Sequence, residues 1–320
     1  MENNKTQTTP NVLNRFAQLL KTEVKNRRME IPEKFGKGYC AGFVFNEHIR
    51  MLILNYELKE DIVLENPDLG ASGRMILFKF QNILPKLGTE SMEKQVKTVP
   101  SVLIATSNMN TEAIIPIDTN PASINIEVEA KYLSGLFDLS GKSPVLQSLL
   151  QDTQPLLFEQ MIYPSLQKIV NEMVTGHVGE IFELFFMRIK AEELVCRLLM
   201  ELEKRDEKRL YSLNSADIQA IYNVKEQMLK HLGTPPVIKE LAANVHMSPT
   251  KLKRLFKQIF GNSIFSYYQE FRMQEAARLL KEDKLSVSDV GYRLGFSNLS
   301  HFSRVFKEHV GMKPKKYSRL

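Results

Sequence analysis

Hydrophobic residues follow two different spacings along the chain, and the change falls near Pro144. Before it, short segments rich in β-branched and aromatic residues partly alternate between apolar and polar positions, a pattern typical of strands. Four such segments are expected in one sheet or barrel: Leu52 to Leu58, Met75 to Phe80, Ser101 to Ala105 and Ile124 to Val128. After Pro144 the apolar residues recur at helical spacing. This order of strands and helices predicts an α+β protein.

The stretch from Val178 to Leu202 carries more apolar residues than one helical stripe requires. It predicts one long helix or two shorter ones, and we expect its surplus apolar face, with Leu194 and Leu198, to pair with a second copy. The charged run KRDEKR at residues 204–209 then predicts a linker. A further helix is expected to begin at Ser215 as its N-cap and to end at Gly233.

The C-terminal region contains a tandem repeat. The segment RLFKQIFG at 254–261 recurs as RVFKEHVG at 304–311, an offset of 50 residues. Upstream, apolar and small residues at i, i+3, i+4 and i+7 recur at an offset of 49: Ile238, Leu241, Ala242 and Val245, then Val287, Val290, Gly291 and Leu294. Each copy therefore predicts a short helix, a turn and a second helix, with helix-turn-helix units at 237–260 and 287–310.

The turns of the two copies support this interpretation. Ala242 and Gly291 are small where the two helices of each unit cross. Both second helices end at a glycine suited to a left-handed cap. Gly295 suits the positive φ of the second turn, whereas its counterpart in the first copy is His246, which tolerates that conformation better than most residues.

The second helix of each copy has an apolar back and a polar front. The fronts hold Thr250, Lys253, Arg254 and Lys257 in the first copy, and Ser300, Ser303, Arg304 and Lys307 in the second. Such a helix fits the major groove, where Arg and Lys bond guanine and Ser or Thr bond bases or phosphates. From Asp217 to Leu320 the chain has 18 Lys and Arg against nine Asp and Glu, a net +9 where the whole chain has +6. A structural hairpin with a solvated charged face is the plain alternative.

From about Ser215 to Leu320 the chain resembles the AraC/XylS family of bacterial regulators. The likeness rests on IKELAANVHMSPTKLKRLFKQIFG, on FRMQEAARLL, and on SVSDVGYRLGFSNLSHFSRVFKEHVGMKPKKY. It implies base contacts from Thr250, Lys253 and Arg254 in the first unit, and from Leu299, Ser300, His301, Ser303 and Arg304 in the second. It also implies an N-terminal jelly-roll or cupin-like effector domain with dimerisation helices. The segment IKAEELVCRLLMEL at 189–202 is similar to the middle region of siderophore-responsive members.

The pattern and the resemblance together predict a regulator with two domains. We expect an N-terminal arm at 1–35, an effector-binding and dimerisation domain at 36–205, a linker at 206–214 and a DNA-binding domain at 215–320. The expected function is sequence-specific transcription activation, controlled by a small-molecule effector. The expected partners are promoter or operator DNA, RNA polymerase and a second copy of the chain. Apolar runs are far shorter than the ~20 residues that span a bilayer, so we expect a cytoplasmic protein without membrane contact.

Other residues invite different interpretations. The run GKS at 141–143 lacks the glycine that a phosphate-binding loop needs at Leu136, and Ser143 before Pro144 is better explained as a helix N-cap. His48 and His177 lack ligand-spaced partners, and the cluster of Phe182, Phe185 and Phe186 is typical of a helix interface. Neither a metal site nor a cofactor is expected.

Two further functions remain open as alternatives. An alkyl-transfer repair enzyme fused to this module would need clustered cysteines, but Cys40 and Cys196 are isolated, so the chain is not expected to be an enzyme. A non-specific architectural DNA binder is distinguished from a regulator by whether base sequence changes its affinity at fixed salt.

Overall fold

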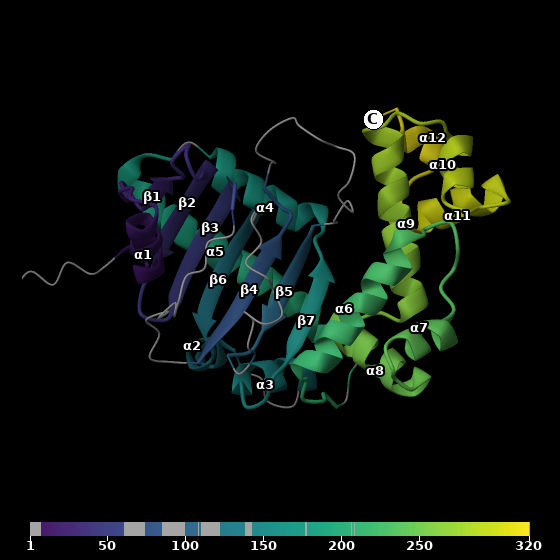
Figure 1. Ribbon diagram of the computed structural model, residues 1–320, viewed down its shortest axis with the longest axis horizontal. Coiled ribbons are helices and arrows are strands. Elements are labelled where there is room, and N and C mark those ends of the chain that lie inside the picture. Colours follow the sequence, from purple (N-terminus) through teal and green to yellow (C-terminus); the bar gives the residue numbers. More distant parts are fainter. Residues whose placement is uncertain are drawn as a thin grey trace, which may run out of the picture. The chain divides into compact units, whose positions relative to one another are not determined.

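The computed structural model describes residues 8–60, 74–84, 100–107, 109, 122–137, 143–176, 178–205, 207 and 209–319. The chain divides into two compact units, Met1–Ser215 and Ala216–Leu320. The first contains a sheet with helices, and the second is helical (Figure 1). No helix among the described residues has a stretch both long and apolar enough to span a bilayer.

The described strands of the first unit form one antiparallel sheet in the order β1-β2-β3-β6-β4-β5-β7. Their bounds are β1 Arg28–Glu30, β2 Gly36–Val44, β3 Ile49–Leu58, β4 Met75–Gln81, β5 Ser101–Ala105, β6 Ala122–Glu129 and β7 Leu157–Met161. Strand β4 shows why these segments pair: every second residue is buried, which places its apolar side chains on one face. The four segments expected as strands correspond to β3, β4, β5 and β6.

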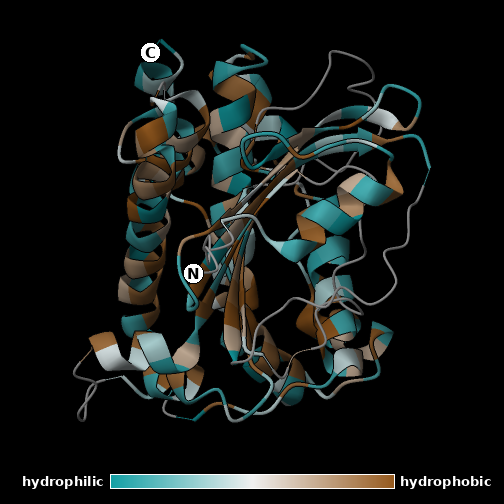
Figure 2. Cartoon of the chain, turned by 90° about the vertical axis from the view of Figure 1, so that its left-hand side faces the viewer, coloured by the Kyte–Doolittle hydropathy of each residue, from teal (hydrophilic) through white to brown (hydrophobic). Residues whose placement is uncertain are grey.

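One face of the sheet is covered by helices, and the main core lies between them. These helices are α2 Ala130–Leu136, α3 Pro144–Gln151, α4 Pro164–Thr175 and α5 Glu180–Glu203. The expected N-cap is confirmed at α3, where the Ser143 hydroxyl accepts from the Leu146 amide and Pro144 follows at the first helical position. Hydrophobic positions on the strands and on one side of the helices appear in brown in Figure 2.

Helix α5 settles the choice between one helix and two, because it runs unbroken for 24 residues. Leu194 and Leu198 are fully buried in the core of the first unit. The expectation that these two leucines lie in a dimer interface is therefore wrong. Both leucines lie on the side of α5 that faces the sheet, while other apolar residues of the same helix stay exposed.

The stretch expected to be an N-terminal arm contains two elements. Helix α1 (Asn11–Leu19) packs against the other face of the sheet, where Leu13, Phe16 and Leu20 join Cys40 and Tyr56 in a second cluster. Strand β1 pairs with β2. Residues 8–35 therefore contribute to the folded unit, and burial of these side chains stabilises the edge of the sheet.

The described strands do not form the jelly-roll or cupin-like arrangement that the family resemblance implies. A jelly roll packs a second sheet against the first, whereas here α3, α4 and α5 cover that face. Strand β7 also departs from expectation, because it lies beyond Pro144, where the spacing predicts helices. Its run of buried residues pairs with β5 at the sheet edge, a partner that local spacing does not reveal.

The second unit is built on one long helix, α9 (Ile264–Lys281). The other helices are α6 Ser215–Lys230, α7 Ile238–Asn244, α8 Pro249–Phe260, α10 Val287–Arg293, α11 Leu299–Val310 and α12 Pro314–Tyr317. Near the start of α9, Tyr267 contacts Phe256 and Phe260 of α8. Farther along, Met273, Ala276 and Leu280 join α10 and α11 in a separate cluster. Helix α9 thus belongs to the core of both halves of the repeat.

Candidate nucleic-acid interface

The first half of the repeat forms α7, a turn and α8. His246 takes a positive φ of 53° in the turn, as expected for the counterpart of Gly295. The Ser248 hydroxyl accepts a hydrogen bond from the Lys251 amide at 3.2 Å and so caps the N-terminus of α8. The helix ends at Gly261, whose φ of 73° is the expected left-handed cap.

The second half forms α10, a turn and α11 in the same way. Gly295 has a φ of 76°, and Gly311 closes α11 with a φ of 84°. Here the N-cap is Asn298, whose carboxamide oxygen accepts from the amides of Ser300 at 2.9 Å and His301 at 3.0 Å. This cap fixes the start of the helix that carries the expected base contacts.

The second crossing needs a small residue, as the sequence predicts. Ala242 is buried in α7. A Cβ atom added at Gly291 would lie 2.6 Å from Cδ2 of Leu299 and 3.3 Å from Cδ1 of Phe302. Any side chain at residue 291 would therefore push α10 away from α11 and change how α11 is held.

The ten residues expected to contact DNA all lie on α8 and α11. Thr250, Lys253, Arg254, Ser300, His301, Arg304 and Lys307 are exposed, and Lys257, Leu299 and Ser303 are half-buried. The opposite sides of the two helices are buried, with Phe256 and Ile259 in α8 and Phe302 and Phe306 in α11. The structure thus brings these residues of each copy together on the accessible side of its own helix, except Leu299, whose side chain lies against Gly291 of α10.

Several residues that hold this surface were not among the predicted site residues. On α9, the nearly buried Arg272 donates from Nη2 to the carbonyl oxygen of Leu294, where α10 ends. Its guanidinium lies 4.1 Å from the ring centre of Phe296, and Phe296 in turn contacts His301 with ring centres 5.7 Å apart. Burial lowers the pKa of Arg272. Arg272 thereby links α9 to the second turn and to a predicted base contact.

The end of α6 is held against both α9 and the second turn. The Tyr268 hydroxyl donates to the carbonyl oxygen of Leu232 at 2.7 Å. A Cβ atom at Gly295 would lie 2.0 Å from the carbonyl oxygen of Gly233. In the first half, Lys251 pairs with Asp217 of α6 at 2.7 Å. The cap rule could have found Asn298 in the sequence, but Arg272 and Tyr268 depend on contacts far apart in the chain.

Comparison with known proteins agrees with this geometry. A helix-turn-helix domain family matches residues 241–320. The arabinose operon regulatory protein of Salmonella typhimurium is 35% identical over 80 residues, which cover 25% of this chain and 28% of that protein. The C-terminal unit is thus similar in sequence to regulators of the AraC/XylS family. The regulatory protein PchR of Pseudomonas aeruginosa is 36% identical over 75 residues, covering 23% of this chain and 25% of PchR.

The family match at residues 241–320 lies in the C-terminal unit, whereas the Msm operon regulatory protein of Streptococcus mutans is 26% identical over 150 residues, which cover 47% of this chain and 49% of that protein. The region matched in the arabinose operon regulatory protein and in PchR covers only about a quarter of each, and both are regulatory proteins and not enzymes. A solved AraC-type transcriptional regulator from Chromobacterium violaceum is 28% identical, with 33% of this chain and 95% of that chain covered and a TM-score of 0.31.

Residues set aside in the sequence have ordinary places in the first unit. His48 pairs with Glu129 at 2.6 Å and stacks on Tyr132. Within the part of the chain that the structure describes, no group of three or more His, Cys, Asp or Glu is placed to hold a metal ion. Gly141, Lys142 and His177 lie outside the described residues.

Proposed function

We propose that the chain is a sequence-specific transcription regulator that binds promoter or operator DNA through α8 and α11. The observation that carries this proposal is the pair of capped helices that expose matching polar faces from one repeat. Helices of this kind enter the major groove with their N-terminal residues at the base edges. The excess of Lys and Arg in this unit adds attraction to phosphate.

The ten residues divide by their place along each helix. Thr250, Lys253 and Arg254, with their counterparts in α11, are proposed to contact bases. Lys257 and Lys307 lie a turn farther on and are proposed to contact phosphate. Leu299 and Ser303 are half-buried, so their proposed contact needs the groove to approach the helix closely.

The test is selection of binding sites from a randomised duplex library by the full chain at fixed salt. A regulator enriches one sequence and binds it about 10³-fold or more tightly than random DNA. Equal affinity for every sequence would instead indicate an architectural binder and contradict the proposal.

The activating role, contact with RNA polymerase and control by an effector are parts of the same proposal. A first unit with its own core, and without the basic surplus of the second, is suited to bind a small molecule and alter how DNA is bound. A reporter driven by the selected site tests this. If the fragment from Asp217 onward acts identically to the full chain under all growth conditions, effector control is wrong.

A homodimer is also proposed, now through a different side of α5. Ile181, Phe182, Phe185 and Ile189 are 91%, 65%, 65% and 45% exposed. Their spacing places them along one side of the helix. An exposed apolar strip of this kind is typical of an association surface, and a second copy presents the same strip.

A further inference from the structure

The first unit contains a cavity of about 300 Å³ between α2, α5 and the edge of the core. Its wall is mostly apolar, with Leu133, Leu136 and Phe137 on one side and Ala191 and Val195 on the other. Leu136 and Phe137 remain 57% and 38% exposed, although both line the cavity. Small-molecule sites are typically apolar hollows of about 300–1,000 Å³ with a few polar groups that fix orientation.

The polar groups of this cavity are Tyr132, Arg188 and Glu192. Nε of Arg188 donates to Oε1 of Glu192 at 3.0 Å. This hydrogen bond, together with the negative charge of Glu192, holds the pKa of Arg188 above its usual range. The wall therefore offers donors and acceptors together, while the net charge of the Arg188–Glu192 pair is zero.

This pairing decides which ligands fit. A carboxylate or sulfonate would be attracted by Arg188 but repelled by Glu192, and a cation would meet the reverse. A neutral hydroxyl, amide or amine can accept from one partner and donate to the other. Such a neutral group also avoids the free-energy cost of burying an unpaired charge.

We propose that this cavity binds an uncharged, mostly apolar small molecule that carries one hydrogen-bonding group. The inference rests on the proposed effector control and names the site and the class of its ligand. Helix α5 lines the cavity with Ala191 and Val195 and carries the proposed dimer strip, so a ligand there contacts the element that joins two copies.

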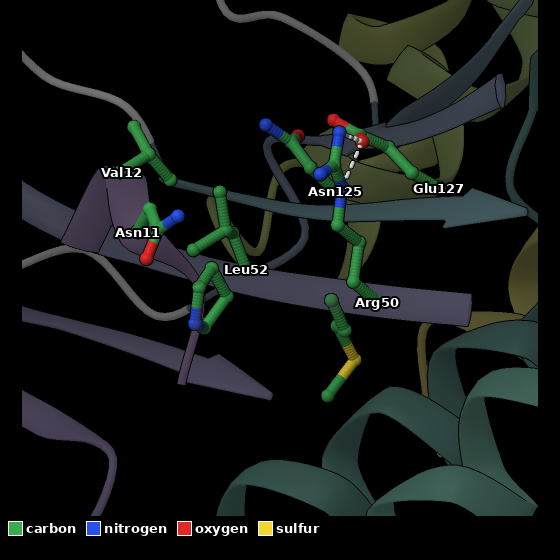
Figure 3. A pocket seen from close by; sticks show the side chains of 8 residues that line it. Asn11, Val12, Arg50, Leu52, Asn125 and Glu127 are labelled. Carbon is green, nitrogen blue, oxygen red and sulfur yellow. Dashed lines mark hydrogen bonds and ion pairs between the residues drawn. The ribbon is translucent and has the colours of Figure 1, made fainter. Parts of the chain in front are cut away.

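Two other hollows of the first unit fit a ligand less well. The one bounded by α1, β3 and β6 has room for only about 10 Å³, about one water molecule. In Figure 3 its wall includes Arg50 and Glu127, whose side chains point toward each other and form an ion pair. A larger, open groove of about 850 Å³ has charged residues such as Lys25, Arg28 and Glu183 beside apolar ones such as Phe43 and Met187, so it fits an uncharged molecule less well.

Two dyes with the same skeleton test the class of ligand. N-phenyl-1-naphthylamine is neutral and carries one N–H group, whereas 1-anilinonaphthalene-8-sulfonate adds a single negative charge. Titrated into the full chain, the neutral dye is expected to bind once per chain, with enhanced fluorescence, and more tightly than the sulfonate. Glu192→Gln removes the repelling carboxylate and should tighten binding of the sulfonate several-fold. Glu193→Gln is the matched control, since Glu193 lies outside the cavity wall.

Two further measurements place the bound dye. Leu136→Asp introduces a charge at the rim of the cavity and should weaken binding of the neutral dye by at least tenfold. Leu19→Asp, at a residue 46% exposed on α1, should leave binding of the dye unchanged. Cys196 lines the cavity and is exposed, whereas Cys40 is fully buried and burial raises its pKa. The neutral dye should therefore slow alkylation of Cys196 by N-ethylmaleimide, followed by mass spectrometry.

Each contrary result overturns the inference. No saturable binding, equal binding by Leu136→Asp and the native chain, or undiminished alkylation of Cys196 would exclude the cavity as the site. Tighter binding of the sulfonate by the native chain would exclude a neutral ligand. Affinity for the selected DNA site is measured on the same samples. DNA binding that persists while the dye fails to bind separates failure of this site from failure of the proposed function.

Discussion

At the scale of single residues, neighbouring side chains on the same helix are expected to have different roles. Arg254 is exposed on the first turns of α8, and Lys257 is half-buried one turn later. In the proposed major-groove complex, only Arg254 is expected to meet base edges. Their substitution should therefore change different properties of DNA binding.

We predict that Arg254→Ala lowers affinity by about 1–3 kcal/mol and relaxes base preference at one half of the site, because a guanidinium bonds guanine through two donors. Lys257→Ala should weaken binding to all sequences alike. It should also reduce, by about one, the slope of log affinity against log salt concentration. Binding of each variant to the randomised library at two salt concentrations measures both effects. The assignment of roles fails if Arg254→Ala weakens every sequence equally while Lys257→Ala changes which bases are preferred.

The second turn needs glycine at residue 295 for two reasons, the positive φ of that residue and the lack of space for a Cβ atom. A matched pair of alanine substitutions distinguishes the two. Gly295 and Gly311 both have positive φ, but only at Gly295 would a Cβ atom collide with backbone, at the carbonyl oxygen of Gly233. Gly311→Ala should cost about 1–2 kcal/mol, the strain of the left-handed conformation. Gly295→Ala should cost more and also lower DNA affinity, because the turn that positions α11 must shift.

Calorimetry of the full chain measures this difference through the melting of the C-terminal unit. In a unit of this size, about 1 kcal/mol corresponds to roughly 4–8 °C. Equal losses for the two alanine variants would show that the contact with Gly233 does not constrain the turn.

At the scale of elements, the sequence predicts best those structures whose signals are local. The caps, the glycines and the helical stripes of the repeat lie within a few residues of one another, and α7, α8, α10 and α11 form as expected. Strand β2 contains three glycines and alternates weakly, and β7 depends on pairing with β5. Neither was predicted, because strand pairing joins distant segments.

Helix α5 shows a second limit of the same kind. Its surplus of apolar residues is visible in the sequence, but the side that enters the core is decided by the sheet beneath it. Leu194 therefore lies inside, and Phe182 and Phe185 remain accessible. A surplus of apolar residues predicts that a helix has two apolar contacts without assigning a partner to each.

We predict that Phe182→Glu combined with Phe185→Glu raises the dissociation constant of a homodimer at least tenfold, about 1.4 kcal/mol, by placing charges in an apolar contact. Phe265→Glu, at a phenylalanine 54% exposed in the C-terminal unit, is the control and should leave association unchanged. Sedimentation of the native chain and of the two variants over a range of concentrations measures the dissociation constant. A native chain that sediments as a monomer throughout would exclude the dimer.

At the scale of the whole molecule, the two halves of the repeat are not equivalent. Lys253 of the first half is replaced by Ser303 in the second, and α11 begins with Leu299 and His301. Helix α9 packs against α8 at one end and against α10 and α11 at the other, so it fixes the separation of α8 and α11. Two helices held in this way are suited to successive major-groove segments, about 34 Å apart.

We therefore predict that one C-terminal unit recognises a direct, asymmetric site whose halves differ in sequence, in contrast to the palindrome recognised by two copies related by a two-fold axis. Inserting about five base pairs between the halves rotates one by about half a turn and should abolish specific binding, because α9 cannot follow it. Arg254→Ala and Arg304→Ala should relax preference in different halves. Site selection with each variant, followed by binding to the spaced duplexes, measures all three effects. Unchanged affinity after the insertion would show that the two helices bind independently, and relaxation of the same half by both variants would contradict the assignment of one half to each helix.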